Sequence, residues 1–159
     1  MFKCGGRKSL QLTLNVIGDY CGGCNFESYP YKAELPIVID GKRPTWIFES
    51  DEDVWKVIDL IIQETKELNE TEGKQFDIEL SVQAQLPFFS CKNRLFSREM
   101  QKDIQRYMYC EKFGVSPYSG DFGKQPCLWV DKVFIIKKAF ANLEKNQIKK
   151  AKKDGSRKN

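Results

Sequence analysis

The cysteines are the residues best suited to chemistry in this chain, which has six Cys and no His among its 159 residues. Cys21 and Cys24 form one close pair, in which Gly22 and Gly23 allow the backbone to turn tightly with both thiols on the same side. Two thiolates on one turn are half of a tetrahedral zinc site. The other ligands would come singly from Cys4, Cys91, Cys110 and Cys127. The pair is therefore interpreted either as ordinary reduced thiols or as part of one structural zinc site at Cys21 and Cys24.

Catalytic signatures are missing from the sequence. Redox use of the Cys pair needs a helix that starts at the thiols and lowers their pKa, and the residues after Cys24 open no such helix. Without His there is no Ser-His or Cys-His nucleophile pair. P-loop, dinucleotide and nucleophile-elbow motifs are also absent. The acidic run at 49–53 has consecutive residues that point in different directions, so it predicts a helix cap and not a catalytic site. We expect a non-enzymatic protein.

The net charge of +4 comes from the C-terminal end. Residues 148–159 contain a single acidic residue, and their basic residues are Lys149, Lys150, Lys152, Lys153, Arg157 and Lys158. We expect these residues to form a basic, disordered tail that follows one folded domain over residues 1–147. A tail of this kind can also bind the phosphates of nucleic acid by counterion release, without reading sequence.

Nothing in the chain predicts contact with a membrane. Its apolar runs are interrupted by charges every few residues, so no segment is long enough to cross a bilayer. The first residues also lack the apolar core of a secretory signal. We expect a protein that is not secreted and that stays in a reducing cytoplasm.

Alternation of apolar and polar residues predicts four strands. Leu10–Val16 is expected to be a strand with one buried face, and Phe76–Leu86 a central antiparallel strand. Tyr31–Ile39 and Thr45–Phe48 are expected to pair as a hairpin around the turn signal Asp40-Gly41.

Helix start and stop signals predict three longer helices. Ser50 with Asp53 predicts a capped helix that ends near residues 69–73. Ser97 predicts a second helix over 98–113, and the side chains expected on its inward face are Met100, Ile104, Tyr107 and Met108. Gly114 suits the C-cap of that second helix, and Pro126 suits the first turn of a long C-terminal helix. The fold class that we predict is α+β, with a small, mainly antiparallel sheet packed against about three helices.

The segment Tyr109–Leu143 is the one around which we expect the chain to be organised, because it joins two helices through a short loop. After Pro126, apolar residues recur at spacings of four, three, four and three, which places them along one helix stripe. They are Trp129, Val133, Ile136, Phe140 and Leu143. A stripe this broad must be covered by the protein's own core or by a partner chain.

This segment resembles one found in small proteins of tailed bacteriophages. The residues that carry the resemblance are Ser116-Pro117-Tyr118-Ser119-Gly120, then Gln125-Pro126, then Trp129 and Ile135-Ile136. The phage proteins have a Pro-Tyr-x-Gly loop and a Gln-Pro helix start, often with an acidic residue where this chain has Lys124. The resemblance implies a virion-region protein, in tail assembly or as an accessory factor, located in the host cytoplasm or the virion. It implies no catalytic residue.

The resulting hypothesis is a protein that binds another protein, a virion or assembly component, through the loop and the adjacent helix start. The residues proposed for binding are Pro117, Tyr118, Phe122, Gln125, Pro126 and Trp129. Aromatic residues on a loop stiffened by proline are the usual anchors of such contacts. Two alternatives stay open: a zinc-stabilised nucleic-acid-binding protein that uses the basic tail, and a phage-encoded inhibitor of a host protein. Self-association into a homo-oligomer is compatible with each hypothesis.

Overall fold

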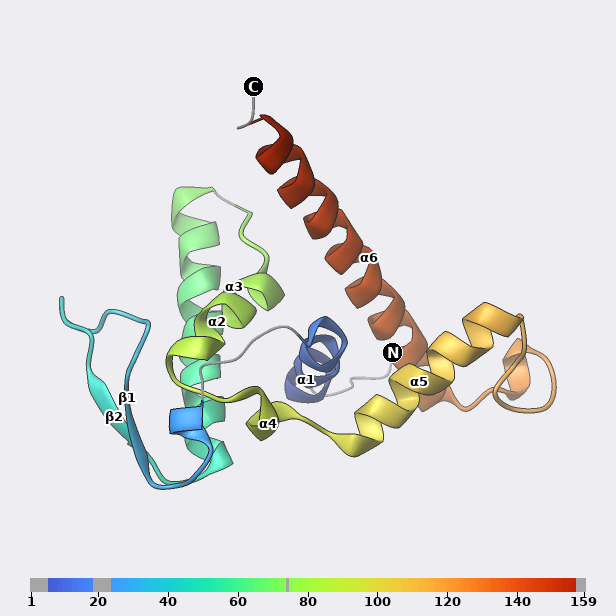
Figure 1. The fold of residues 1–159 in the computed structure, drawn as a ribbon, viewed down its shortest axis with the longest axis horizontal. Helices are drawn as coiled ribbons and strands as arrows, with labels where there is room; N and C mark the ends of the chain where they lie inside the picture. Colours follow the sequence, from blue (N-terminus) through green and yellow to red (C-terminus); the bar gives the residue numbers. More distant parts are fainter. Residues whose placement is uncertain (1–5, 19–23, 74, 157–159) are drawn as a thin grey trace. The chain divides into compact units, whose positions relative to one another are not determined.

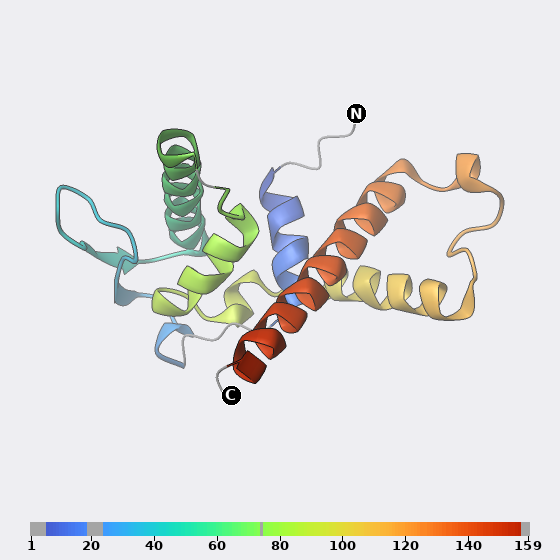
Figure 2. The same ribbon diagram turned by 90° about the horizontal axis from the view of Figure 1, so that it is seen from above.

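The structure, a computed structural model, describes residues 6–18, 24–73 and 75–156 (Figures 1 and 2). The chain divides into two compact units. The helical unit comprises Met1–Ile17 with Ser97–Asn159, and the sheet unit comprises Gly18–Phe96. That residues 1–147 fold as a single domain stays a prediction, because this division concerns contacts and not folding behaviour.

The sheet unit contains the only strands of the described chain. In order, its elements are η1 (Cys24–Phe26), β1 (Tyr31–Glu34), β2 (Thr45–Phe48), α2 (Asp51–Glu72), α3 (Ile78–Gln85), η2 (Leu86–Phe88) and α4 (Lys92–Leu95). The strands β1 and β2 are antiparallel, with Tyr31 opposite Phe48 and Glu34 opposite Thr45. Asp40 and Gly41 both have positive φ, 50° and 75°, as the tight turn of a hairpin requires. The predicted hairpin is confirmed, with a first strand that ends at Glu34 and not at Ile39.

Helix α2 begins and ends where its cap signals predict. Asp53 Oδ2 accepts hydrogen bonds from the backbone N–H groups of Ser50 at 3.1 Å and of Glu49 at 3.0 Å. Gly73 follows the last turn with a φ of 62°, a left-handed conformation that glycine adopts without strain. The buried face of the helix consists of Val54, Val57, Ile58, Ile61 and Thr65. The core also contains the stacked rings of Tyr31 and Phe48, with centroids 4.9 Å apart.

The predicted strand at Phe76–Leu86 is wrong, since residues 78–86 form α3 and the start of η2. The Asp77 carboxylate caps α3 by accepting the N–H of Leu80 at 3.0 Å. Val82 and Leu86 are fully buried, and Ile78 is half-buried. These three lie four residues apart, so the even alternation of the sequence contains an i, i+4, i+8 helix stripe.

The helical unit is built from α1 (Gly6–Ile17), α5 (Arg98–Phe113), η3 (Phe122–Lys124) and α6 (Cys127–Ser156). The predicted strand at Leu10–Val16 is wrong, because this segment lies in α1, which packs against α5 and α6. The unit's buried cluster takes residues from all three helices: Leu12, Ile104, Tyr107, Trp129 and Ile136. The helix predicted over 98–113 is confirmed, with Ser97 Oγ accepting the N–H of Met100 at its start.

The α+β class is confirmed, and the described chain contains more helix and a smaller sheet than the sequence pattern predicts. Residues 148–156 have helical backbone as the last turns of α6. That the tail is disordered in solution stays a prediction. Among the described residues, none of the helices combines the length and apolar character needed to cross a membrane.

Candidate partner-binding surface

The loop of residues 114–126 joins α5 to α6 and extends beyond the adjoining ends of both helices (Figures 1 and 2). It begins at Gly114, whose φ of 64° lets the chain leave α5 in the left-handed conformation. The N–H groups of Gly114 and Val115 both donate to the Cys110 carbonyl. The predicted C-cap is therefore confirmed, and the direction of the loop is set at its first residue.

Gln125 closes the other end of the loop. Its side-chain Nε2 donates to the carbonyl oxygens of Tyr118 at 3.1 Å, Gly120 at 3.2 Å and Asp121 at 3.4 Å. Ser116 Oγ also donates to the Tyr118 carbonyl, at 2.8 Å. Gln125 thus ties the middle of the loop to the start of α6.

Tyr118 is anchored on the helices. Its hydroxyl accepts a hydrogen bond from Arg106 Nη1 at 2.9 Å, and its ring packs edge to face on Trp129 with centroids 6.2 Å apart. The Arg106 guanidinium lies 5.6 Å from the Tyr118 ring and 5.5 Å from the Trp129 ring, within cation–π range of both. Trp129 is 6% exposed and belongs to the buried cluster, so it supports the loop from the core side.

The remaining predicted binding residues differ in exposure. Phe122, in η3, is 73% exposed, and Tyr118 retains 38% exposure. Pro126 is exposed, whereas Pro117 and Gln125 are half-buried. The structure therefore brings the six residues into one region and gives them separate parts: Phe122 and Tyr118 on the surface, Gln125 as a tie within the loop, and Trp129 in the core.

Sequence reasoning missed an exposed apolar group at the C-terminal end of α5. Met108, which was expected to face inward, is 53% exposed, and Tyr109 and Phe113 are 59% and 58% exposed. The rings of Tyr109 and Phe113 contact each other with centroids 4.7 Å apart. An open groove of about 480 Å³ is lined by these three residues, by Tyr107 and by Phe140 of α6. The spacing of Tyr109 and Phe113 by four residues, off the Ile104–Tyr107 stripe, is the signal that could have found them.

A charged cluster fixes α5 against α6. Lys132 Nζ lies 2.5 Å from Asp103 Oδ2 and 3.7 Å from Glu99 Oε1, and Arg106 Nη1 lies 3.9 Å from Asp103 Oδ1. The hydrogen bond to Asp103 raises the pKa of Lys132. These residues pair their charges with one another, and their arrangement accounts for the position of Arg106 beneath Tyr118.

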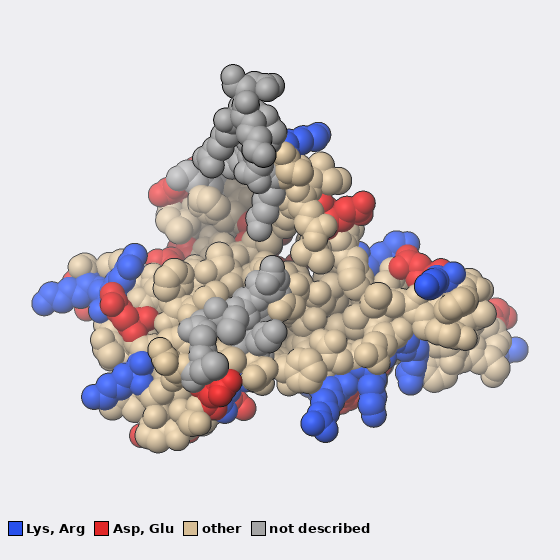
Figure 3. Space-filling model, in the orientation of Figure 1, with Lys and Arg blue, Asp and Glu red and all other residues tan. Residues whose placement is uncertain are grey.

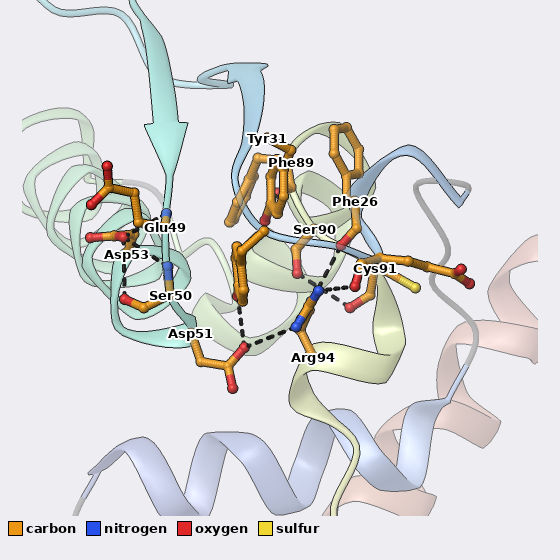
Figure 4. A network of polar contacts seen from close by, with 12 residues as sticks. Phe26, Tyr31, Glu49, Ser50, Asp51, Asp53, Phe89, Ser90, Cys91 and Arg94 are labelled. Carbon is orange, nitrogen blue, oxygen red and sulfur yellow. Dashed lines mark hydrogen bonds and ion pairs between the residues drawn. The ribbon is translucent and has the colours of Figure 1, made fainter.

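A second polar network lies in the sheet unit, centred on Arg94 (Figure 4). Arg94 donates to the carbonyls of Phe26 and Glu27, and its guanidinium lies 3.9 Å from the centroid of the Tyr29 ring. The Tyr29 hydroxyl donates to Asp51 Oδ1 at 2.7 Å. Burial, followed by this hydrogen bond, raises the pKa of Tyr29. A neutral phenol that donates and a paired guanidinium hold the segment before β1 in place, which is a structural role.

The candidate zinc site cannot be built from the described residues. Cys21 lies outside them, and Cys24 is described only as the first backbone position of η1. Cys91 is buried, Cys110 half-buried and Cys127 exposed, each as a free thiol. Within the described ranges, no group of three or more Cys, Asp or Glu is placed to hold a metal. The zinc at Cys21 and Cys24 stays a prediction.

Of the predicted phosphate-binding residues, Lys149 and Lys152 are exposed on α6. Lys150 and Lys153 lie on the same helix as backbone positions, and Arg157 and Lys158 lie outside the described residues. Comparison of the chain with protein-family models, with curated proteins and with solved structures finds no match.

Proposed function

We propose that this chain is a non-enzymatic protein that binds another protein through the surface of residues 108–122. This 108–122 surface consists of Met108, Tyr109, Phe113, Tyr118 and Phe122. The observation that carries the proposal is Phe122, a large apolar ring that is 73% exposed on a loop with a defined conformation. Exposed aromatic groups held in one position are typical anchors of protein interfaces.

Rigidity supports the proposal as much as exposure does. A flexible loop would lose conformational freedom on binding, at about 0.5–1.5 kcal/mol for each immobilised side chain. Here Gln125 and Ser116 already fix the loop, and Arg106 and Trp129 already hold Tyr118. The aromatic groups are therefore presented in advance, and less entropy is lost when a partner covers them.

The groove at the C-terminal end of α5 supports a partner that inserts apolar side chains. Its walls are the Met108, Tyr109 and Phe113 side chains, with the charged residues Glu111 and Lys112 also lining it. An apolar groove with charged residues of both signs suits a protein segment of mixed composition. The bacteriophage resemblance suggests a component of the virion or of its assembly as the partner.

A photo-crosslinking experiment tests this function. A benzophenone amino acid is placed at Phe122 and, as the matched control, at Phe88, which is 63% exposed on the 3₁₀ turn η2. In the cells that make the protein, we expect a specific crosslinked partner from position 122 and none of it from position 88. The partner is then purified and its affinity for the chain is measured.

Phe113→Ala with Phe122→Ala should weaken that affinity tenfold or more, which corresponds to about 1.4 kcal/mol. Both side chains are more than half exposed, so the variant should keep its circular dichroism spectrum and thermal midpoint. Equal crosslinking from both positions, or unchanged affinity in the double variant, contradicts the proposal. The partner's identity separates an assembly factor from an inhibitor of a host protein.

A further inference from the structure

Helix α5 has an exposed face on the side away from the core. The buried residues of the helix are Asp103, Ile104 and Tyr107. At about 100° of rotation per residue, the opposite side holds six exposed residues within a sector of about 100° and over an axial length of about 22 Å. These six residues, called the outer face of α5 below, are Arg98, Lys102, Gln105, Tyr109, Lys112 and Phe113.

The outer face of α5 is positively charged, because three of its residues are basic and none is acidic. Among the described residues, no carboxylate forms an ion pair with Arg98, Lys102 or Lys112. Lys112 Nζ lies instead 5.8 Å from the centroid of the Phe113 ring. In Figure 3, basic side chains gather at the lower edge of the view, where Figure 1 draws the start of α5.

The acidic residues of α5 interact with groups away from the outer face. Glu99 lies 3.7 Å from Lys132 of α6, and Asp103 lies closer to the same lysine. Glu111 accepts a hydrogen bond from the Tyr107 hydroxyl. These carboxylates therefore have partners within the helical unit, and the charge of the outer face is left for a group from outside the chain.

The C-terminal end of the same face is apolar. Tyr109 and Phe113 are 59% and 58% exposed, and both line the open groove of about 480 Å³. Arg98 and Lys102 lie nearer the start of the helix. A partner that follows α5 from Arg98 to Phe113 therefore meets positive charge first and apolar surface next.

We propose that the outer face of α5 binds an acidic segment of the partner protein, with apolar side chains in the groove and Asp or Glu side chains against Arg98, Lys102 and Lys112. This inference rests on the proposed protein-binding function and names the class of segment that is bound. Charge complementarity argues for this occupant, since charges around an interface speed association with the opposite sign and disfavour the like sign. The groove is also lined by Glu111, so the preference for acidic residues comes from the basic residues of the outer face.

The aromatic geometry favours a protein segment over single-stranded nucleic acid. Nucleic-acid bases stack on the open faces of aromatic rings. The Tyr109 and Phe113 rings contact each other with 47° between their planes, and Lys112 lies over the Phe113 ring. This tilted pair beside a groove suits aliphatic and aromatic side chains, which fill a groove without needing a flat platform.

The test selects peptides from a random library displayed on yeast, with the full-length chain as the bait at 50 mM NaCl. The peptides have about 16 residues, because a helix of that length matches the outer face. We expect the selected peptides to be richer in Asp and Glu, and in large apolar residues, than the unselected library. Their affinity should fall at least about fivefold between 50 and 200 mM NaCl.

The variant R98Q/K102Q/K112Q should bind the selected peptides about tenfold or more weakly than the unmodified chain. The matched control K32Q/K42Q/K66Q removes the same charge from exposed lysines of the sheet unit. It should bind the same peptides within about threefold of the unmodified chain. All six positions are exposed, so both variants should keep the circular dichroism spectrum and the thermal midpoint.

Three results would overturn the proposal. One is a set of selected peptides that is no richer in Asp and Glu than the library. Another is an equal loss of affinity in both triple variants, which would make net charge the whole cause. The third is tighter binding to a single-stranded DNA of about 20 nucleotides than to the selected peptides, with the same dependence on the three basic residues.

The crosslinking experiment at Phe122 separates this proposal from the protein-binding function on which it rests. A partner that crosslinks from position 122 through a segment without excess Asp and Glu would leave the protein-binding function in place and overturn the acidic class alone. The lack of any specific partner from position 122 would instead contradict the protein-binding function itself.

Discussion

Lys132 of α6 contacts Asp103 of α5 with 2.5 Å between Nζ and Oδ2, so this ion pair joins the two helices. The Asp103 residue is 7% exposed, and the Lys132 side chain is 27% exposed. Glu99, at 3.7 Å from Lys132, is 84% exposed in its side chain. Lys132 therefore makes one contact that is shielded from solvent, with Asp103, and one that is screened by solvent, with Glu99.

Asp103→Ala should lower the free energy of unfolding by about 1–3 kcal/mol, because it leaves the Lys132 ammonium partly buried without its closest partner. Partial exposure of Lys132 reduces the penalty from that of a fully buried pair. Glu99→Ala removes the exposed partner and should cost less than about 0.5 kcal/mol. Urea unfolding at pH 7, followed by circular dichroism, compares the two. Equal effects would mean that the Asp103 contact is screened as well.

The loop conformation depends on Gly120, whose φ is 101°. A Cβ atom at this position would lie 2.6 Å from Lys124 Cδ and would also strain the backbone. Gly120→Ala should therefore destabilise the loop by about 1–3 kcal/mol and speed amide exchange at Lys124 and Gln125, whose N–H groups donate to Asp121 and Phe122.

Gly123 provides the matched control for Gly120, since it lies in the same loop and a Cβ there would meet only Asp121 Oδ1, at 3.5 Å. Gly123→Ala should leave exchange in the loop nearly unchanged. Hydrogen exchange by mass spectrometry measures both variants. Similar exchange in the two would show that the loop tolerates a side chain at Gly120 and is less rigid than the partner-binding proposal requires.

The caps and the hairpin could be predicted from the sequence because their signals are local. Ser50 with Asp53, Ser97, and Gly114 each act within one helical turn, and Asp40-Gly41 sets its own turn. The structure confirms these elements. Tertiary context contributes little to their definition, so a single sequence is enough to place them.

The two wrong strands share one physical cause. A spacing of four residues is a multiple of two, so a helix stripe at Ile78, Val82 and Leu86 is also part of a perfect alternation. In α1, Leu10 and Leu14 are also four residues apart and buried. Leu12, between them, is buried as well, so every second residue from Leu10 to Leu14 is apolar, as in a strand. Helix and strand then differ only in whether the intervening residues face solvent, and that depends on neighbouring elements that the pattern does not reveal.

The candidate site could be predicted in part. The aromatic residues of the loop were expected to serve as anchors, and the structure places Phe122 on the surface. The roles of Gln125 and Arg106 could not be derived, because each depends on carbonyls and rings brought together only by the folded loop. The exposed group at Tyr109 and Phe113 was missed because it lies off the stripe that predicts burial.

Tyr31 provides a test of the sheet unit at alkaline pH. Its hydroxyl donates to the Phe89 carbonyl at 2.9 Å, and burial raises its pKa to about 12 from a usual value of 10.0. A raised pKa means that the folded state retains the phenol proton more tightly than the unfolded state. The stability that this phenol contributes is therefore fully present below pH 10 and is lost as the pH rises toward 12.

We expect the free energy of unfolding to fall from pH 10 to pH 12, and to fall less steeply in Tyr31→Phe, which has no proton to lose at this position. At pH 7 the same variant should be less stable by about 1 kcal/mol, because the Phe89 carbonyl loses its donor. Tyr109→Phe is the control, since Tyr109 is 59% exposed, and it should follow the unmodified chain at every pH. Urea unfolding at pH 7, 10, 11 and 12 measures all three proteins. If the free energy of unfolding of Tyr31→Phe fell as steeply from pH 10 to pH 12 as that of the unmodified chain, the loss would come from other groups. Ionisation of the Tyr31 phenol, which breaks its hydrogen bond to Phe89, would then not be its cause.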